Sequence, residues 1–343
     1  MSERILVTGA TGFLGRALLP LLAARGHALR ALARDAAGPA DGEGLPAGTD
    51  VVPASVEDRE AVRRALSGVE TVFHLAGRVD FDPVDPAALY RLHVEGTRTL
   101  LEDALAAGVS RFVLASSSGT VAVSEEARES TEADLEPVGI VAGWPYYLSK
   151  LYQEKVALRF HRDTGLPVVV LNPSLLLGPG DARLGSTSVV FKFLERRIPA
   201  MPSGGLSFVD VRDAAATFAE ALERARPGER YLLGGANMTF AEFFGRISRL
   251  SGVPAPRLRL PTPASLAGAR LLERLHAWRG SEPPLSAQEV EMGERFWYVD
   301  ASKARRELGF APRDPQETLF ETWRFVEERF RGRRAGAAAS PPR

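Results

Sequence analysis

The stretch Thr8-Gly9-Ala10-Thr11-Gly12-Phe13-Leu14-Gly15 follows a short apolar run, Ile5–Val7, and leads into a segment with helical spacing of apolar residues, Phe13–Arg25. Glycines in such a loop allow a tight turn, a close approach of the backbone to a pyrophosphate, and close packing of the helix on the strand. The unpaired N–H groups at the start of the helix then face the phosphates. The stretch therefore predicts a dinucleotide-binding loop, with Gly9, Thr11, Gly12, Phe13, Leu14 and Gly15 in contact with the cofactor.

Short apolar runs continue to alternate with helical segments as far as about residue 180. Expected strands lie at 29–33, 51–53, 71–75, 111–115 and 168–171, and expected helices lie near 58–66, 86–107 and 145–164. This order is typical of an α/β fold, namely a Rossmann-type doubly wound parallel sheet with helices on both faces. Beyond Gly180 the alternation loosens, and helices near 188–197, 213–224, 240–251 and 264–278 are mixed with proline-rich loops. A smaller, mixed substrate lobe is expected there.

These patterns predict a division of the chain by role. We expect residues 1–180 to form the NADP-binding domain, with return segments near 206–234. Residues 181–330 should form mainly the substrate-binding lobe, and residues 331–343 a disordered tail.

Composition excludes several classes of function. Lys plus Arg and Asp plus Glu both total 43 in 343 residues, so there is no basic excess for a nucleic-acid partner. No cysteine is present, which excludes disulfides, thiolate metal sites and cysteine nucleophiles, and we expect no metal. The first strand begins at once, and no apolar run approaches the roughly 20 residues of a membrane span. We expect a cytoplasmic protein with a small-molecule substrate and leave a homodimer open.

The end of the second strand bears on the choice of cofactor. The strand ends Leu32-Ala33-Arg34-Asp35, so the position where an acidic residue would bind the ribose hydroxyls of NAD holds Ala33. The guanidinium of Arg34 suits a 2′-phosphate. We therefore predict NADP rather than NAD. The alternative is that Arg34 is a surface charge paired with Asp35.

Tyr146 and Lys150 form the expected chemical centre. Four residues apart on one helix, they share a face. An adjacent ammonium favours the phenolate, so we expect Lys150 to lower the pKa of Tyr146 from its reference value of about 10. The strand 111–115 delivers Ser116, Ser117 and Ser118 to the carboxyl edge of the sheet, where ligands bind in such folds. A hydroxyl there can hold a substrate carbonyl against the tyrosine.

The glycine loop, the serine strand and Tyr146-x-x-x-Lys150 together resemble the extended short-chain dehydrogenase/reductases of the NAD-dependent epimerase/dehydratase superfamily. Further matching motifs lie at Phe73–Gly77, Asn172–Ser174, Gly178–Asp181, Phe208–Asp213 and Lys303–Phe310. Within the superfamily the chain is most similar to the dihydroflavonol-4-reductase-like group. The residues that carry this similarity are Asn172-Pro173, Arg34 and Ser116–Val121. Residues Glu282–Leu285 also resemble a bacterial hopanoid-associated branch.

The resemblance implies roles for individual residues. Tyr146 would be the proton donor or acceptor, and Lys150 its electrostatic partner and a ribose ligand. The serine role falls on Ser117, with Ser118 as the alternative. Cofactor contacts would also come from Leu75, Ala76, Gly77, Asn172, Pro173 and Ser174. Two departures stand out: His93 occupies a position where such families usually place Asn, and Ser55 one where they usually place Asp.

The leading functional hypothesis is reversible hydride transfer between NADP(H) and a ketone or aldehyde, or the matching secondary alcohol. Apolar residues in 181–207 and 260–298 favour a hydrophobic substrate, although most of them should be lobe core. The alternatives are a nucleotide-sugar epimerase or dehydratase, which recycles its cofactor internally, and a non-catalytic dinucleotide-sensing regulator. An intact Tyr146 and Lys150 argue against the regulator.

Overall fold

A seven-stranded parallel sheet forms the centre of the molecule. The computed structural model describes residues 2–34, 44–81, 85–281 and 283–331. The strand order is β3-β2-β1-β4-β5-β6-β9, and every neighbouring pair is parallel. The strands are β1 (Arg4–Thr8), β2 (Ala28–Ala33), β3 (Asp50–Pro53), β4 (Thr71–His74), β5 (Arg111–Ala115), β6 (Val168–Pro173) and β9 (Arg230–Leu233). The order reverses between β1 and β4, which opens a crevice at the carboxyl edge of the sheet.

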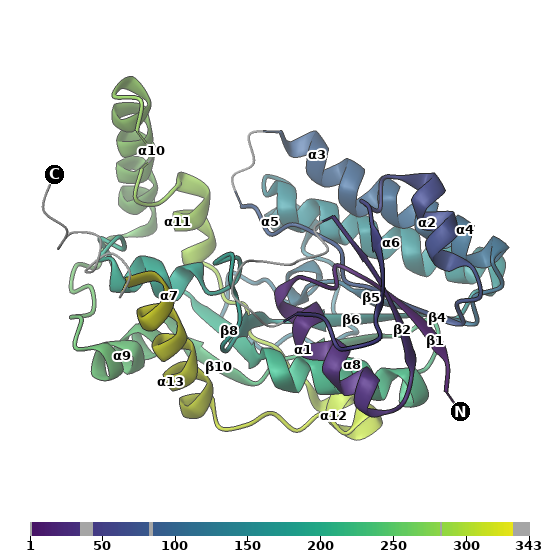
Figure 1. The fold of residues 1–343 in the computed structure, drawn as a ribbon. Helices are drawn as coiled ribbons and strands as arrows, with labels where there is room; N and C mark the ends of the chain where they lie inside the picture. The colour runs from purple at the N-terminus through teal and green to yellow at the C-terminus, as the bar shows by residue number, and fades with distance from the viewer. Residues whose placement is uncertain (1, 35–43, 82–84, 282, 332–343) are drawn as a thin grey trace, which may run out of the picture.

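Helices cover both faces of this sheet (Figure 1). One face carries α1 (Phe13–Ala24), α8 (Val211–Arg224) and α12 (Ser302–Leu308), and the other carries α2 (Arg59–Leu66), α4 (Gly96–Ala106) and α6 (Pro145–Thr164). An apolar core lies on each face of the sheet, and successive residues of a strand pack into the two cores in turn. In β1, Ile5 and Val7 face one core, and Leu6 faces the other. Burial on both faces explains why the strands read as continuous apolar runs.

A second, smaller sheet organises the C-terminal part. Its order is β10-β8-β7, from β7 (Leu175–Leu177), β8 (Gly205–Asp210) and β10 (Ala236–Thr239), with β8 parallel to β7 and antiparallel to β10. A third apolar cluster, with Phe208, Phe243 and Phe244, packs around it. Helices α7 (Ser188–Leu194), α9 (Phe240–Ser251) and α13 (Pro315–Val326) contribute to that cluster. Helix α10 (Thr262–Trp278) projects from this part beside α11 (Ala287–Gly293) (Figure 1).

The predicted fold class is confirmed, with some differences in detail. Residues 211–233 return to the large sheet through α8 and β9, while β8 just before them joins the small sheet. The helix expected at 86–107 consists of α3 (Pro86–Tyr90), a π-helical turn at Arg91–Glu95, and α4. Sequence periodicity did not reveal β7, β8, β9, β10, α11, α12, α13 or the short α5 (Val138–Val141). The division of roles near residue 180 stays a prediction.

Some expectations concern parts outside the described residues, namely the tail from 332 onward and the residues Asp35 and Glu282. Within the described chain, none of the helices is both long enough and apolar enough to cross a membrane.

Candidate active site

The glycine loop leaves the carboxyl end of β1 and starts α1 in close contact with the end of β4. Gly9 has a φ of +69°, and a Cβ at this position would lie 2.7 Å from the backbone nitrogen of Ala76. A Cβ on Gly15 would collide with the carbonyl oxygen of Gly9. Gly12 is the N-cap residue of α1 and brings no side chain over the N–H groups of the first turn. The loop therefore presents bare backbone, as close binding of a pyrophosphate requires.

A cleft of about 930 Å³ runs along this loop. Arg34, at the end of β2, is exposed and lines it, and Arg16 lines it from the first turns of α1. The Nε atom of Arg16 is buried and has no hydrogen-bond partner among the described residues. Two guanidinium groups beside a bare glycine loop fit a cofactor that carries phosphates.

The predicted cofactor residues do not all face this cleft. Thr11, Gly12, Phe13, Arg34 and Gly77 line it. Leu14 is buried in the core beneath α1, where Leu75 also packs, and Ala76 packs against the opposite core. Pro173 and Ser174 line a second, adjoining pocket, and Asn172 is fully buried.

Tyr146, Lys150 and Ser117 converge at the carboxyl edge of the large sheet. Tyr146 and Lys150 lie on the buried side of α6, whose N-terminal Pro145 has the fixed φ that suits the first helical position. The side chain of Ser117 lies close enough to the phenol of Tyr146 to affect its pKa. Lys150 Nζ donates to the carbonyl oxygen of Ala115 at 2.7 Å, at the end of β5. The structure thus brings together the three residues that the resemblance singled out, and Ser117 rather than Ser118 contacts the tyrosine.

The expected lowering of the Tyr146 pKa is wrong for this arrangement. Burial raises the pKa of Tyr146 to about 12, and the side chain of Ser117 opposes that rise only in part. Burial also lowers the pKa of Lys150 to about 7, against the raising effect of the Glu154 carboxylate. Desolvation dominates at Tyr146, and Lys150 makes its hydrogen bonds to Ala115 and Gln153 rather than to the phenol. Tyr146 is therefore held protonated at neutral pH.

A buried polar chain connects Lys150 to the glycine loop. Lys150 Nζ donates to Gln153 Oε1 at 2.6 Å, and Gln153 Nε2 donates to Thr97 Oγ1 at 2.8 Å. His74 bridges Thr97 and Thr8, with Nε2 at 2.8 Å from one hydroxyl and Nδ1 at 2.7 Å from the other. Burial, with a contribution from Lys150, lowers the pKa of His74 to about 3, so the ring is neutral. The chain therefore adds no second charge beside Lys150.

His93 stands where related families place Asn, and it links the cofactor cleft to α6. The π-helical turn holds it inside the molecule, with its ring 6.0 Å from that of Tyr146. The backbone N–H of Arg78 donates to His93 Nε2 at 3.1 Å, so the proton of the neutral ring lies on Nδ1, which is 2.8 Å from Ser149 Oγ. Ser149 Oγ in turn donates to the carbonyl oxygen of Tyr146. Burial lowers the pKa of His93 well below its usual value.

A second buried cluster fixes the serine turn. Glu154 Oε2 accepts hydrogen bonds from Ser116 Oγ, Thr120 Oγ1 and Asn172 Nδ2 at 2.7–3.0 Å. Asn172 also donates to the carbonyl oxygen of Ser117 at 3.1 Å. Arg230 Nε lies 2.9 Å from Glu154 Oε1, which balances the buried carboxylate. The Asn172 side chain, which we expected to bind the cofactor, thus holds the backbone of Ser117 in place.

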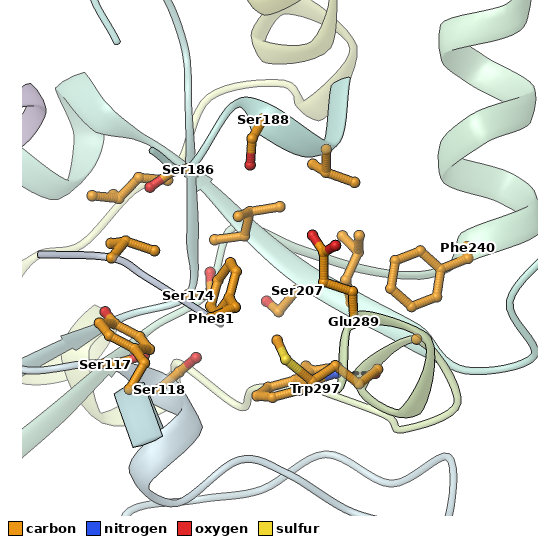
Figure 2. Close-up of a pocket in the computed structure, with 18 of the residues that line it drawn as sticks. Phe81, Ser117, Ser118, Ser174, Ser186, Ser188, Ser207, Phe240, Glu289 and Trp297 are labelled. Carbon is orange, nitrogen blue, oxygen red and sulfur yellow. Dashed lines mark hydrogen bonds between the residues drawn. The ribbon is translucent and has the colours of Figure 1, made fainter. Parts of the chain in front are cut away.

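The second pocket, of about 260 Å³, opens in front of Ser117 and Tyr146. In Figure 2, Ser117 and Ser118 lie at one end and Phe240 and Glu289 at the other. Apolar side chains dominate its wall, among them Phe81, Val189, Ile198, Leu206, Phe244, Leu285, Met292 and Trp297. The hydroxyls of Ser174 and Ser207 line it, and both are buried without a partner among the described residues.

The pocket and the cofactor cleft share a wall. Phe81, Ser186 and Ser188 line both, as does the ion pair of Lys192 and Glu289. The ring of Phe81 lies 5.6 Å from that of Tyr146 in an edge-to-face arrangement. A substrate in the pocket and a cofactor in the cleft would therefore meet next to Tyr146.

Sequence reasoning missed several residues of the site. Gln153 lies three positions after Lys150, and Glu154 lies one position further, so helical spacing on α6 could have placed both beside the lysine. Arg16, just after the glycine loop, could have been found as a second cation near the phosphates. Phe81 and Ser207 lay in segments without a readable pattern, and only the fold brings them to the pocket.

Comparison with known proteins agrees with this geometry. The family model described as the NAD dependent epimerase/dehydratase family matches residues 5–234. Sterol demethylase protein B of Methylococcus capsulatus is 33% identical over 331 residues, which are 94% of this chain and 98% of that protein. Dihydroflavonol 4-reductase of Zea mays is 34% identical over 189 residues, 51% of this chain and 53% of that protein. The crystal structure of gox2253 matches with a TM-score of 0.82 and 31% identity, covering 96% of this chain and 99% of that chain.

These matches confirm the resemblance that the glycine loop, the serine strand and the Tyr146–Lys150 helix indicate. The family model spans more than half of the chain and includes all three motifs. The chain belongs to the NAD dependent epimerase/dehydratase family, and it is an NAD(P)-dependent oxidoreductase of the extended short-chain dehydrogenase/reductase type.

Proposed function

We propose that the protein reduces a ketone or aldehyde on a hydrophobic small molecule with NADPH, or oxidises the matching secondary alcohol with NADP. The observation that carries this proposal is the placement of Tyr146 and Ser117 together in the wall of a mainly apolar pocket. A carbonyl oxygen accepting from both hydroxyls would be polarised for attack at its carbon. The name of the relative from Zea mays, a reductase, supports this reaction class.

The protein's own groups account for the proton. The nicotinamide supplies the hydride for reduction and accepts it in the reverse direction. Tyr146, protonated at neutral pH, donates its phenolic proton to the alkoxide oxygen that forms as the carbonyl carbon gains the hydride. Ser117 holds that oxygen in place. An ammonium has three donors, of which Lys150 uses two within the protein, so one remains for a ribose hydroxyl.

The assignment of NADP as the cofactor depends on the residues at the end of β2. Ala33 offers no carboxylate to a ribose diol, and Arg34 and Arg16 both line the cleft beside the glycine loop. A 2′-phosphate would accept charge-assisted hydrogen bonds from these guanidinium groups. Gly77 borders the same cleft, and Pro173 and Ser174 line the adjoining pocket, where we place the nicotinamide end. In this proposal the large-sheet unit binds the cofactor and the smaller lobe closes over the substrate.

The pocket supports a substrate class rather than a single compound. Its wall of aromatic and aliphatic side chains favours an apolar body. The unpartnered hydroxyl of Ser207, deep in this wall, would pair with a further oxygen of the substrate, because a buried hydroxyl without a partner is costly. The relative named sterol demethylase protein B agrees with an apolar substrate. A homodimer and a cytoplasmic location stay predictions.

A nucleotide-sugar epimerase or dehydratase is the second candidate, since the family model carries that name. The two reactions differ in cofactor balance: a reductase consumes NADPH with each turnover, whereas an epimerase returns its cofactor to the starting state. A dinucleotide-sensing regulator would bind the cofactor and turn over neither class of substrate.

A spectrophotometric screen separates these candidates. Aliphatic, aromatic and steroid-like carbonyls are mixed with the protein and NADPH, and the loss of NADPH absorbance is followed, with Tyr146→Phe as the control. We expect at least one apolar carbonyl to be reduced by the wild type alone. Conversion of a nucleotide sugar without net NADPH consumption would support the epimerase instead, and the absence of any turnover by either assay would support the regulator.

A further inference from the structure

Helix α10 turns an apolar stripe toward solvent. Leu271, Leu275 and Trp278 follow one another at i, i+4 and i+7, which puts them on one face of the helix. All three are exposed, Leu271 to 58% and Trp278 to 83%. The single buried residue of α10 is Ala269, two positions before Leu271 and so about 200° around the helix. The stripe therefore lies on the side of α10 opposite its buried residue. Figure 1 shows that the helix itself projects from the body of the protein.

Further apolar residues are exposed near the stripe in sequence. Leu258 and Leu260 are exposed as well, and so is Leu272 on α10. Four of these six residues lie on the projecting helix α10, which differs from the scattered apolar residues of an ordinary surface. We call Leu258, Leu260, Leu271, Leu272, Leu275 and Trp278 the α10 patch.

Basic residues border the α10 patch. Between Arg257 and Ser281 the chain has five arginines and one acidic residue, Glu273, although its net charge as a whole is zero. The arginines are Arg257, Arg259, Arg270, Arg274 and Arg279, and all are exposed. None of the five forms an ion pair with a described residue. Glu273 is turned to the protein, where its carboxylate accepts from the backbone N–H of Ala287 at the start of α11.

We propose that the α10 patch docks on an anionic lipid surface. A helix with Leu and Trp on one face, flanked by Arg, is suited to lie in the plane of a membrane interface, with its apolar face among the acyl chains. Each arginine gains from the negative potential of anionic headgroups. Charge favours this partner over a second copy of the chain, because two copies meeting at the patch would bring ten like charges together.

One helix, α11, separates α10 from the substrate pocket. Helix α10 packs against α11, and α11 contributes Glu289, Met292 and Gly293 to the pocket wall. A lipid surface at α10 would thus place that wall close to the apolar phase. An apolar substrate dissolved in the lipid could then reach the pocket directly. Docking on lipid does not depend on the proposed reaction.

Vesicle binding tests the proposal on the full chain. Co-sedimentation is measured with vesicles of equimolar phosphatidylcholine and phosphatidylglycerol, and with vesicles of phosphatidylcholine alone. We expect binding to the mixed vesicles that weakens as salt rises, and weaker binding to the neutral ones. The variant Leu271→Gln/Leu275→Gln should bind the mixed vesicles about tenfold more weakly or worse, because it removes apolar side chains that would enter the acyl region. Leu135→Gln, at a residue 91% exposed elsewhere, is the matched control and should bind as the wild type does.

Tryptophan emission gives a second readout. Addition of mixed vesicles should shift the emission to shorter wavelength in the wild type, and Trp278→Phe should abolish the shift. NADPH binding, measured by fluorescence titration, should be unchanged in all of these variants, which shows that they fold. Failure of the wild type to bind mixed vesicles would overturn the proposal, as would equal binding by the Leu271→Gln/Leu275→Gln variant. A concentration-dependent dimer in analytical ultracentrifugation that this variant abolishes would assign the patch to a second copy instead.

Discussion

Lys150 Nζ donates a hydrogen bond to Gln153 Oε1 at 2.6 Å, one helical turn further along α6. Both side chains are buried, and the amide of Gln153 is oriented by its own hydrogen bond to Thr97. A fixed carbonyl dipole next to a desolvated ammonium stabilises the charged form of that ammonium. Gln153 is therefore a positioning residue for Lys150, and it sets how easily the lysine keeps its proton.

The pH dependence of turnover should report this contact. With the pKa of Lys150 at about 7, kcat at saturating NADPH should fall as pH rises and the ammonium is lost. Gln153→Leu removes a hydrogen bond that favours the charged form, so the fall should move to lower pH by about one pH unit. Gln153→Glu adds a negative charge and should move it to higher pH. Shifts of the kcat profile in opposite directions would show that Gln153 acts electrostatically and not only by packing. Shifts of both variants in the same direction would contradict an electrostatic role.

Replacement of Tyr146 by Phe should abolish turnover and leave the cofactor site intact. The phenolic hydroxyl carries the proton in the proposed reaction, so kcat should fall by about 100-fold or more. The Kd for NADPH, measured by fluorescence titration, should stay within about a factor of two. Tyr152→Phe is the matched control, since Tyr152 lies on the exposed side of the same helix. A Tyr146→Phe enzyme that kept more than about a tenth of wild-type kcat would assign the proton to another group.

Changing His93 to the Asn of related families should weaken cofactor binding. The shorter side chain can still reach Ser149, but it withdraws the acceptor that His93 Nε2 offers to the backbone N–H of Arg78 at the edge of the cleft. Without this hydrogen bond the backbone at Arg78 is held less well in its cofactor-binding position, and a bond of about 0.5–1.5 kcal/mol corresponds to a Kd for NADPH raised up to about tenfold. His93→Gln reaches further and should restore much of the affinity. Wild-type affinity in the Asn variant would show that His93 only fills space.

Cofactor choice should follow Ala33 and Arg34. A charge-assisted contact of Arg34 with a 2′-phosphate is worth about 1.5–3 kcal/mol, so NADPH should bind about one to two decades more tightly than NADH. That preference should narrow as salt rises, because Arg34 is exposed. The double variant Ala33→Asp/Arg34→Ala adds an acceptor for the ribose diol and removes the phosphate partner, so it should prefer NADH.

Titration of both reduced cofactors against the wild type and the double variant checks this prediction. Arg159→Ala, an exposed arginine on α6, serves as the charge control and should keep the NADPH preference. Equal affinities in the wild type would mean that Arg34 is only a surface charge.

The sequence by itself determined six of the seven strands of the large sheet and the place of its chemistry. Strands buried on both faces read as apolar runs, and the glycine loop must join the first strand to the first helix because only glycine fits at Gly9 and Gly15. Helical spacing likewise put Tyr146 and Lys150 on one face of one helix. These are local properties, set by residues that are neighbours along the chain.

Only the tertiary structure decided the charge states and the pocket. The pKa of Tyr146 rises because the fold buries the phenol, and local spacing to Lys150 carries no information on desolvation. His93 and Asn172 gain their roles from partners far away in sequence, namely Ser149 for His93 and Ser117 for Asn172. The pocket wall joins residues of expected helices, such as Val189 and Phe244, to residues outside them, because its side chains come from separate elements instead of repeating along one. Hydrophobic periodicity records which face of an element is buried, whereas the surface that faces it is set by the whole fold.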